Sequence, residues 1–366
     1  MTYIHALADW PNFSWDHEIV ASKLAAVRHR QGRLIGRMER LGFPMRNEAV
    51  LVTLTQDVLK SSEIEGEVLN PQQVRSSLAR RLGLDIAGAV AASRDVEGVV
   101  EMMLDATQNF AAPLTKERLC SWHAALFPTG RSGMHKITVG AWRDDATGPM
   151  QVVSGPIGKE TVHFEAPPAA RLENEMTAFL IWANKTVAVD PVLTAALAHL
   201  RFVTIHPFDD GNGRIARAIA DWGLARSEGS GQRFYSMSAQ ILQERKSYYA
   251  VLEKTQKSSL DVTAWLTWFL DCLDRAIGAT EVTLAVVLRK AQFWEKNAHR
   301  AINERQRTML NALLDGFEGK LTSSKWAKLA KCSQDTASRD IQSLIEQGIL
   351  VKDAAGGRST SYSLEV

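Results

Sequence analysis

The sequence predicts a mainly α-helical protein with one small β-hairpin, followed by a smaller helical unit that ends in two short strands. Apolar residues recur at helical spacing through long segments, among them 190–205 and 214–222. Residues 128–168 are instead interrupted repeatedly by glycine and proline, which break helices. Near the C-terminus, 349–351 and 360–364 are short strand-like runs around a glycine-containing loop. The helical class therefore comes with local β-structure at two places.

The composition is that of an ordinary globular protein, with 45% hydrophobic and 23% charged residues among 366. This length accommodates two or three domains, each with its own core. The net charge of +2 gives no strong attraction to nucleic acid or membrane. Cys120, Cys272 and Cys332 show no metal or disulfide spacing, so we expect buried thiols in a reducing compartment. No signal-peptide pattern or membrane-length apolar run is visible, and we expect a cytoplasmic protein.

The N-terminal region, 1–110, is expected to be helical, and one of its helices should run over 47–66 with Asn47 as its cap. This helix carries an apolar stripe at heptad-like spacing, made of Leu51, Leu54, Val58 and Ser61. The next position on the stripe is Glu65, and an ionised carboxylate on a buried face is costly unless it is paired. The stripe therefore predicts a cationic partner for Glu65, and Arg217 is the candidate.

Helical spacing continues over 72–110, and Thr115 is the expected cap of the helix that follows. The runs 150–154 and 161–164 predict the two strands of a hairpin. We expect its His163 to be a surface histidine, with substrate contact as the alternative.

The segment 205–217 joins two helices and reads Ile-His-Pro-Phe-Asp-Asp-Gly-Asn-Gly-Arg-Ile-Ala-Arg. Its Gly-Asn-Gly turn places backbone N–H groups at the start of a helix, which is an anion-binding arrangement. Arg214 and Arg217 are three residues apart, so they share one helix face above that turn. Two arginines beside such amides suit a polyphosphate. Asp210 is available for an accompanying Mg²⁺ ion, and His206 can take a proton near neutral pH.

These residues match the motif HxFx(D/E)GNGRxxR at every defined position, so the chain resembles the Fic family. The resemblance implies a protein adenylyltransferase, which moves AMP from ATP to a Ser, Thr or Tyr hydroxyl of a target protein. It also implies that His206 is the catalytic base and that Asp210 holds Mg²⁺ or Mn²⁺. The phosphates are then bound by the backbone amides of the turn, the Asn212 side chain and the arginines, which together are Gly211, Asn212, Gly213, Arg214 and Arg217.

The segment Ser61-Ser62-Glu63-Ile64-Glu65-Gly66 is similar to the Fic inhibitory motif (S/T)xxxE(G/N). The resemblance implies that Glu65, with Ser61 in the same motif, pairs with Arg217 and blocks the productive position of the γ-phosphate. The alternative is that Glu65 is a surface charge at a helix end.

Further nucleotide contacts are expected outside the motif. Tyr248 and Tyr249 resemble the adenine-pocket tyrosines of the family, because aromatic faces stack on a purine at little entropic cost; the alternative is that they are core residues. Gln256 lies where relatives often have Asn, and its amide is a candidate nucleotide contact. The hairpin resembles the Fic flap, whose strand edge holds an extended target segment, and its Val152 and Val153 are also candidate contacts.

We expect the catalytic core over 111–275, with the flap over 131–168, a connector helix over 276–299 and a separate domain over 300–366. The element order of the last domain resembles a winged helix. If it meets DNA, the contacting residues are Gln334, Thr336, Ser338, Arg339 and, on the wing, Arg358. Ten Lys and Arg stand against eight Asp and Glu from 300 onward. A dedicated DNA binder usually has a more basic face, so protein contact and homodimerisation stay open.

Two other functions also stay open. One is that the same site transfers a different group, such as UMP or a phosphoryl group, or removes AMP. The other is that the Fic domain senses a ligand for a transcription regulator that works through the winged helix.

Overall fold

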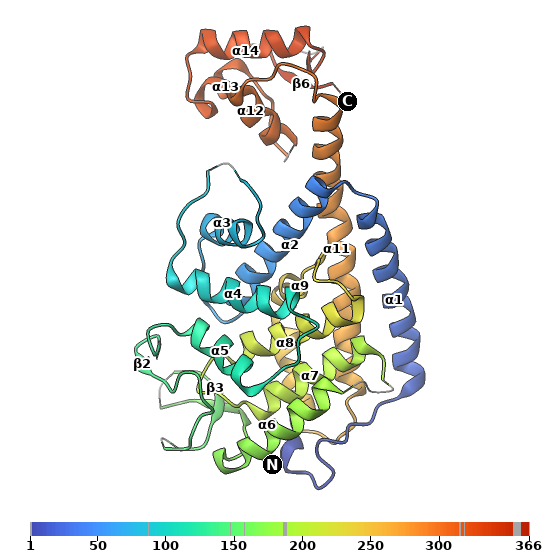
Figure 1. Ribbon diagram of the computed structural model, residues 1–366, viewed down its shortest axis with the longest axis vertical. Coiled ribbons are helices and arrows are strands. Elements are labelled where there is room, and N and C mark those ends of the chain that lie inside the picture. The colour runs from blue at the N-terminus through green and yellow to red at the C-terminus, as the bar shows by residue number, and fades with distance from the viewer. Residues whose placement is uncertain are drawn as a thin grey trace. The chain divides into compact units, whose positions relative to one another are not determined.

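The computed structural model describes residues 2–365 except 87, 147, 157, 186–188, 315, 318 and 354–359, and it describes no side chains for 281–284, 286–288 and 291. The chain divides into two compact units, Met1–Thr280 and Glu281–Val366 (Figure 1). The first unit contains both regions expected at 1–110 and 111–275. Within the described residues, every helix is too short or too polar to cross a membrane.

The first unit begins with the 3₁₀ turn η1 (Ile4–Ala6) and the helices α1 (His17–Glu39), α2 (Phe43–Ile64), α3 (Pro71–Arg81), α4 (Arg94–Gln108) and α5 (Lys116–Leu126). Asp16 caps α1, because its carboxylate accepts the backbone N–H groups of Glu18 and Ile19. Thr115 caps α5 as expected, by accepting the N–H of Arg118. Side-chain caps therefore set the start of both helices.

Two of the expected helix boundaries are wrong. The N-cap of α2 is Gly42 and Pro44 lies in its first turn, so Asn47 is inside the helix and does not cap it. Proline presets the backbone for the first turn of a helix, which explains the earlier start. The segment 72–110 is two helices, α3 and α4, because Gly83 takes a left-handed conformation (φ 69°) just after α3 and ends it.

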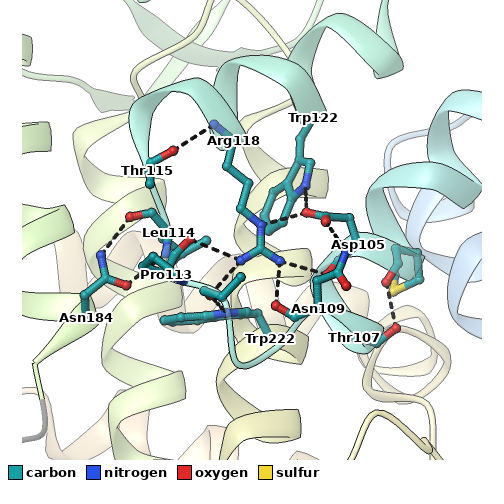
Figure 2. A network of polar contacts seen from close by, with 12 residues as sticks. Asp105, Thr107, Asn109, Pro113, Leu114, Thr115, Arg118, Trp122, Asn184 and Trp222 are labelled. Carbon is teal, nitrogen blue, oxygen red and sulfur yellow. Dashed lines mark hydrogen bonds and ion pairs between the residues drawn. The ribbon is translucent and has the colours of Figure 1, made fainter.

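Arg118 locks α4 to α5 (Figure 2). Its guanidinium donates to the Asp105 carboxylate at 2.6 Å and to the backbone oxygens of Asp105, Asn109, Ala112 and Pro113. The Trp122 indole N–H donates to the same carboxylate at 2.7 Å. These bonds fix the first two turns of α5, the helix that leads to Phe127, whose ring packs against the motif turn. A neighbouring cavity of about 530 Å³ is lined by this structural network.

Two antiparallel hairpins lie in the segment rich in glycine and proline. The short pair β1 (Arg131–Ser132) and β2 (His135–Lys136) was not predicted. The expected hairpin is confirmed as β3 (Gln151–Ser154) and β4 (Thr161–Glu165). Its register shifts between Val152 and Val153, which leaves His163 as an extra residue on β4. Such a β-bulge turns a side chain in a direction that regular pairing does not give.

The rest of the first unit consists of α6 (Ala169–Asn184), α7 (Pro191–Ile205), α8 (Asn212–Glu228), α9 (Met237–Gln243), α10 (Arg245–Gln256) and α11 (Thr263–Lys296). Helix α8 lies in the middle of this unit, in contact with α2, α4, α5 and α7 (Figure 1). Helices α7 and α8 approach closely, since a Cβ added at Gly223 would lie 2.7 Å from the Ala195 Cβ. The motif turn joins these two packed helices and is therefore held rigidly.

The connector helix expected over 276–299 is not a separate element. Helix α11 runs unbroken from Thr263 to Lys296, because the single Gly278 does not stop a helix built otherwise from apolar and helix-forming residues. The end of this helix belongs to the second unit, where Phe293 and Trp294 pack against the core. The second unit therefore begins before residue 300.

The second unit contains α12 (Glu304–Leu314), α13 (Ser323–Leu329), α14 (Gln334–Glu346) and the antiparallel strands β5 (Leu350–Lys352) and β6 (Tyr362–Leu364). Its core includes Leu310, Trp326, Ile341, Leu344 and Leu350. This is the order of elements expected for 300–366. Gln334, Ser338 and Arg339 are exposed at the start of α14, whereas the Thr336 hydroxyl is hydrogen bonded to Ser333 at 2.9 Å. Arg358 lies outside the described residues.

Candidate active site

The motif turn begins with a backbone conformation that is unfavourable for its residue. His206 ends α7 with a φ of 53°, in the left-handed region, which costs a non-glycine residue about 1–3 kcal/mol. Arg143 holds this conformation, since its Nε donates to the His206 carbonyl at 2.8 Å and its backbone N–H donates to the Pro207 carbonyl at 2.9 Å. The Arg143 side chain is buried and also donates to the carbonyl of Pro167. Sequence reasoning missed Arg143, because no local pattern links it to a turn so far along the chain.

The imidazole of His206 has a defined tautomer. Its Nδ1 lies 3.1 Å from the carbonyl oxygen of Val203, which can only accept, so Nδ1 carries the proton and Nε2 keeps a free lone pair. Burial lowers the pKa of His206 to about 4. The imidazole is therefore neutral at physiological pH and able to accept a proton through Nε2.

The side chain of Asn212 has a structural role, which corrects the expectation that it cradles phosphates. Its Oδ1 accepts the N–H of Phe208 at 3.0 Å and its Nδ2 donates to the carbonyl of the same residue at 2.7 Å. A buried amide must satisfy both of its polar groups, and this turn does so internally. Phe208 points into the core as expected and stacks on His123, with ring centroids 4.1 Å apart. His123 is thus a structural histidine.

Both glycines of the turn are required by close packing. Gly211 has a φ of 78°, and a Cβ there would lie 2.9 Å from the Phe127 ring. A Cβ at Gly213 would lie 2.3 Å from a carboxylate oxygen of Glu65 and 3.4 Å from Nη1 of Arg217. The Glu65 carboxylate therefore lies directly against the backbone at the start of α8, where an anion is expected to bind.

The predicted pairing of Glu65 with Arg217 is present. Arg217 Nη2 lies 2.8 Å from Glu65 Oε1, and the arginine side chain is only 2% exposed. Ser61 of the same helix also holds this arginine, by accepting from Nε through its hydroxyl at 2.9 Å and from Nη2 through its carbonyl at 2.8 Å. The stripe on α2 thus supplies the partner that the buried guanidinium requires.

A second carboxylate, Glu67, pairs with the other motif arginine and was missed by the sequence reasoning. Its Oε2 lies 2.5 Å from Arg214 Nη1. Arg214 is buried and its guanidinium also lies over the Phe127 ring at 5.0 Å. Partial burial raises the pKa of Glu67, against the attraction of Arg214. Gly66 has a φ of 88°, and the turn at this residue brings both carboxylates to the same helix face. The sequence feature that could have indicated this pair is the second acidic residue, two positions after Glu65.

Each motif arginine keeps one buried N–H group that has no acceptor among the described residues. These groups are Nε of Arg214 and Nη1 of Arg217. An unsatisfied buried donor is costly, so this position favours an additional anionic group. The two carboxylates neutralise the arginines only in part, and the arrangement retains the character of an anion site.

A cavity of about 630 Å³ opens beside the turn. Among the residues that line it are the sequence-predicted Glu65, Val152, Val153, His206, Gly213, Tyr248, Tyr249 and Gln256. Residues from α2, the hairpin, the motif and α10 therefore surround one space. Its lining does not include Asp210, Gly211, Asn212, Arg214 or Arg217, and Glu65 lies between the cavity and Arg217.

The two tyrosines of α10 have different surroundings. Tyr248 is 1% exposed, and its hydroxyl is hydrogen bonded to His199 Nε2 at 2.8 Å. Tyr249 is 39% exposed, with the Arg245 guanidinium 5.6 Å from its ring centroid. Gln256 Nε2 donates to the Thr204 hydroxyl at 3.2 Å. Tyr249 is therefore the more exposed of the two rings, while Tyr248 is anchored in the core at the cavity wall.

The Asp210 carboxylate is held in place beside the turn. It accepts hydrogen bonds from the Ser132 hydroxyl and from the N–H of Gly211, the latter at 2.5 Å. Within the described residues, no group of three or more His, Cys, Asp or Glu side chains forms a metal cluster. A Mg²⁺ ion carried by phosphates needs only one or two protein carboxylates, so the donor chemistry of Asp210 fits that use. Ser132 was not foreseen, because nothing in its sequence context points to the motif.

Residues 113–224 match the Fic/DOC family, and residues 3–84 match a domain of unknown function (DUF4172). The chain is 33% identical over 116 residues to a protein adenylyltransferase Fic from Nematostella vectensis, which covers 31% of this chain and 25% of that protein. It is 32% identical over 167 residues to protein adenylyltransferase fic-1 from Caenorhabditis briggsae, an alignment that covers 45% of this chain and 30% of that protein. It is also 32% identical over 124 residues to a uridine 5'-monophosphate transferase from Xanthomonas campestris, an alignment that covers 31% of this chain and 22% of that protein. The chain thus spans less than a third of the length of these relatives.

Solved structures share the fold. A Fic family protein from Desulfovibrio desulfuricans superposes with a TM-score of 0.53 at 20% identity, over 94% of this chain and 95% of that chain. A Fic domain containing signaling protein from Bacteroides thetaiotaomicron superposes with a TM-score of 0.52 at 20% identity, over 73% of this chain and 97% of that chain.

Proposed function

Residues 113–224 belong to the Fic/DOC family, and from this premise we propose that the protein transfers AMP from ATP to a hydroxyl group of a target protein. The observation that carries the proposal is the combination of a neutral imidazole at His206 with the anion site of Arg214 and Arg217 at the same turn. Two of the curated relatives named above are adenylyltransferases, which supports AMP as the transferred group.

In this proposal, Nε2 of His206 takes the proton of a target Ser, Thr or Tyr hydroxyl as that hydroxyl attacks the α-phosphorus of ATP. The Nδ1 hydrogen bond to Val203 keeps Nε2 free for this step. Arg143 keeps the imidazole in position by holding its backbone. The contribution of the protein is then mainly positioning and proton transfer.

The phosphates are assigned to the start of α8. The backbone N–H groups of Asn212 and Gly213 and the guanidinium groups of Arg214 and Arg217 bind them, and the arginines stabilise the leaving pyrophosphate. The N–H of Gly211 already donates to Asp210. Asp210 would hold the Mg²⁺ ion, which supplies further charge neutralisation when bound.

The cavity beside the turn is assigned to the nucleoside. Tyr249 offers a partly exposed aromatic ring, and Val152 and Val153 of the hairpin offer apolar surface to the same cavity. A flat base can pack on such surfaces. The second candidate is transfer of UMP, because one of the curated relatives is a uridine 5'-monophosphate transferase. The mass added to a modified target distinguishes the two nucleotides.

The resting state is proposed to be inhibited through both motif arginines. Glu65 occupies the backbone position beside Gly213 and neutralises Arg217, while Glu67 neutralises Arg214. ATP then competes with two carboxylates for the guanidinium groups that should bind its β- and γ-phosphates. The exposed strand β3 of the hairpin is the candidate edge for holding an extended target segment.

The test is incubation of the Glu65→Gly protein with labelled ATP, Mg²⁺ and cell lysate, followed by mass spectrometry of the labelled proteins. We expect AMP on a hydroxyl side chain, and no label with the Glu65→Gly, His206→Ala double variant. Persistence of target labelling after loss of His206 would contradict the assignment of the base.

A further inference from the structure

Helix α2 carries a buried acid, Asp57, about two helical turns before Glu65. Its Oδ1 accepts a hydrogen bond from the Ser236 hydroxyl at 2.5 Å and another from the backbone N–H of Ser238 at 3.3 Å. Ser236 is the N-cap of α9, and Ser238 lies in the first turn of that helix. Asp57 therefore ties α2 to α9, the helix along which α2 packs (Figure 1).

Asp57 belongs to a buried cluster of three charged side chains from three parts of the first unit. Arg233, between α8 and α9, donates from Nη2 to Oδ1 of Asp221 on α8 at 2.9 Å. Asp57 interacts electrostatically with both side chains, and all three are at most 1% exposed. Burial raises the pKa of Asp221 to about 8 and also raises that of Asp57. The two carboxyls therefore hold a proton between them at neutral pH, beside a single arginine.

The cluster continues the contacts that join α2 to α8 at the motif. Residues four apart on a helix share a face, and at this spacing three interactions follow one another along the two helices: Glu65 lies against Gly213, Ser61 binds Arg217, and Asp57 interacts with Asp221 beside Arg233. The order of these partners shows that α2 and α8 run antiparallel here. The cluster is thus the far end of the same interface that places Glu65 at the anion site.

A buried charge cluster contributes little net stability, because removing charges from water costs about as much as their attraction returns. It does restrict how two elements pack, since a shift of either helix leaves a buried charge without its partner. Glu65 is the C-cap of α2, so the place of its carboxylate depends on the place of that helix.

We propose that Asp57 is a positioning residue for inhibition, which holds α2 through Arg233 and Asp221 in the register that places Glu65 against Arg217. This inference deepens the proposed function and rests on it. When the cluster is broken, the end of α2 loosens, the Glu65 carboxylate leaves Arg217, and ATP binds that arginine in its place. Loss of Asp57 should therefore raise transfer although it destabilises the fold. A purely structural residue gives the opposite result.

The experiment measures the initial rate of AMP incorporation from labelled ATP and Mg²⁺ in the presence of cell lysate, for full-length variants with and without Glu65→Gly. Asp57→Ala should raise the rate about tenfold, the factor expected for losing a hydrogen bond to a charged group. In the Glu65→Gly background the same change should raise nothing further, because no carboxylate is left to release.

Two other variants on α2 control for this change. Asp57→Asn keeps an oxygen that can accept from Ser236 and Ser238, so the rate should return to within about twofold of the wild type. Gln56→Ala alters the adjacent, exposed position and should keep the wild-type rate. Thermal melts check that each variant is folded. If Asp57→Ala does not fold, Ser236→Ala removes one of the two hydrogen bonds and should raise the rate about threefold.

Hydrogen exchange gives a readout that does not depend on activity. In Asp57→Ala, or in Ser236→Ala, the amides of residues 58–65 should exchange faster than in the wild type, while the amides of α7 keep their protection. This pattern means that the end of α2 opens locally and that the rest of the first unit stays folded.

The outcomes separate the two proposals. A Glu65→Gly protein that labels targets, together with folded Asp57→Ala and Ser236→Ala proteins at the wild-type rate, would overturn the positioning role and leave the proposed transferase standing. An equal change in both backgrounds would also overturn that role, because Asp57 would then act independently of Glu65. Absence of label from the Glu65→Gly protein would overturn the transferase, and the exchange of residues 58–65 would still decide whether Asp57 holds α2.

Discussion

Replacing Glu65 with glycine tests the proposed inhibition directly, because it removes the carboxylate that pairs with Arg217 and leaves the helix end free to form. The Arg217 side chain is 2% exposed and that of Glu65 is 31% exposed, so solvent screens their interaction only in part. Hydrogen bonds to charged groups in such surroundings contribute about 1.5–3 kcal/mol. Taking about 2 kcal/mol, productive binding of ATP should rise about 30-fold. The assay is the initial rate of AMP incorporation into the protein itself at an ATP concentration below saturation.

Glu63→Gln is the matched control for this change. Glu63 lies on the same helical turn but pairs with Lys60 at the surface, and its side chain is 44% exposed. We expect this variant to keep the wild-type rate. Equal incorporation by the wild type and the Glu65→Gly protein would refute the inhibition argument, whatever the distance between the carboxylate and Arg217.

Three further predictions concern the Glu67–Arg214 ion pair, the proposed base His206 and the proposed metal ligand Asp210, and a fourth concerns the second unit. Glu67→Gln should raise incorporation about fivefold, less than Glu65→Gly, because the Glu67 side chain is 47% exposed and such pairs contribute about 1 kcal/mol or less; an unchanged rate would limit inhibition to one carboxylate. The proposed base His206 can accept a proton only when it is unprotonated, and burial lowers its pKa to about 4, so kcat/KM should stay level from pH 8 to about pH 5 and fall below that; a tenfold drop by about pH 5.5 would contradict this pKa. Asp210→Asn should raise the Mg²⁺ concentration needed for half-maximal transfer about 10- to 100-fold, measured by titration of the metal-depleted protein. If α14 contacts DNA, the full chain should bind its own promoter DNA with an affinity that falls with salt and with Arg339→Ala; absence of binding assigns the unit to protein contact.

The ion pair between Glu65 and Arg217 shows where sequence reasoning succeeds. Helical spacing predicts which side chains share a face of α2, and Glu65 continues the stripe that ends at Ser61, which predicted a cationic partner; in the structure Glu65 is the C-cap of α2 and its side chain is 31% exposed. The motif supplied two arginines on one face of another helix, and the ion pair is present in the structure. Both halves of this prediction depend on short-range geometry, which the sequence sets through the helix period.

Errors and omissions arose where a residue's partner is distant or where several local partners compete. The Asn212 side chain has two polar groups, and spacing alone does not say that the backbone of Phe208 satisfies both. Arg143 reaches His206 across 63 positions in the chain. Helix α11 continues through Gly278, because a single glycine is a weak helix breaker. The sequence analysis instead expected a separate connector helix from 276.

The sequence by itself determined the motif, the helical class, the hairpin and the face on which Glu65 lies, because each follows from residue spacing within one element. Only the tertiary structure decided that Glu67 neutralises Arg214 and that His163 connects Ser154 to Glu253. These contacts join elements whose relative placement is set by packing of the whole unit. The turn at Gly66 and the bulge at His163 also change the direction of the chain, and the helix or strand period alone does not predict such changes.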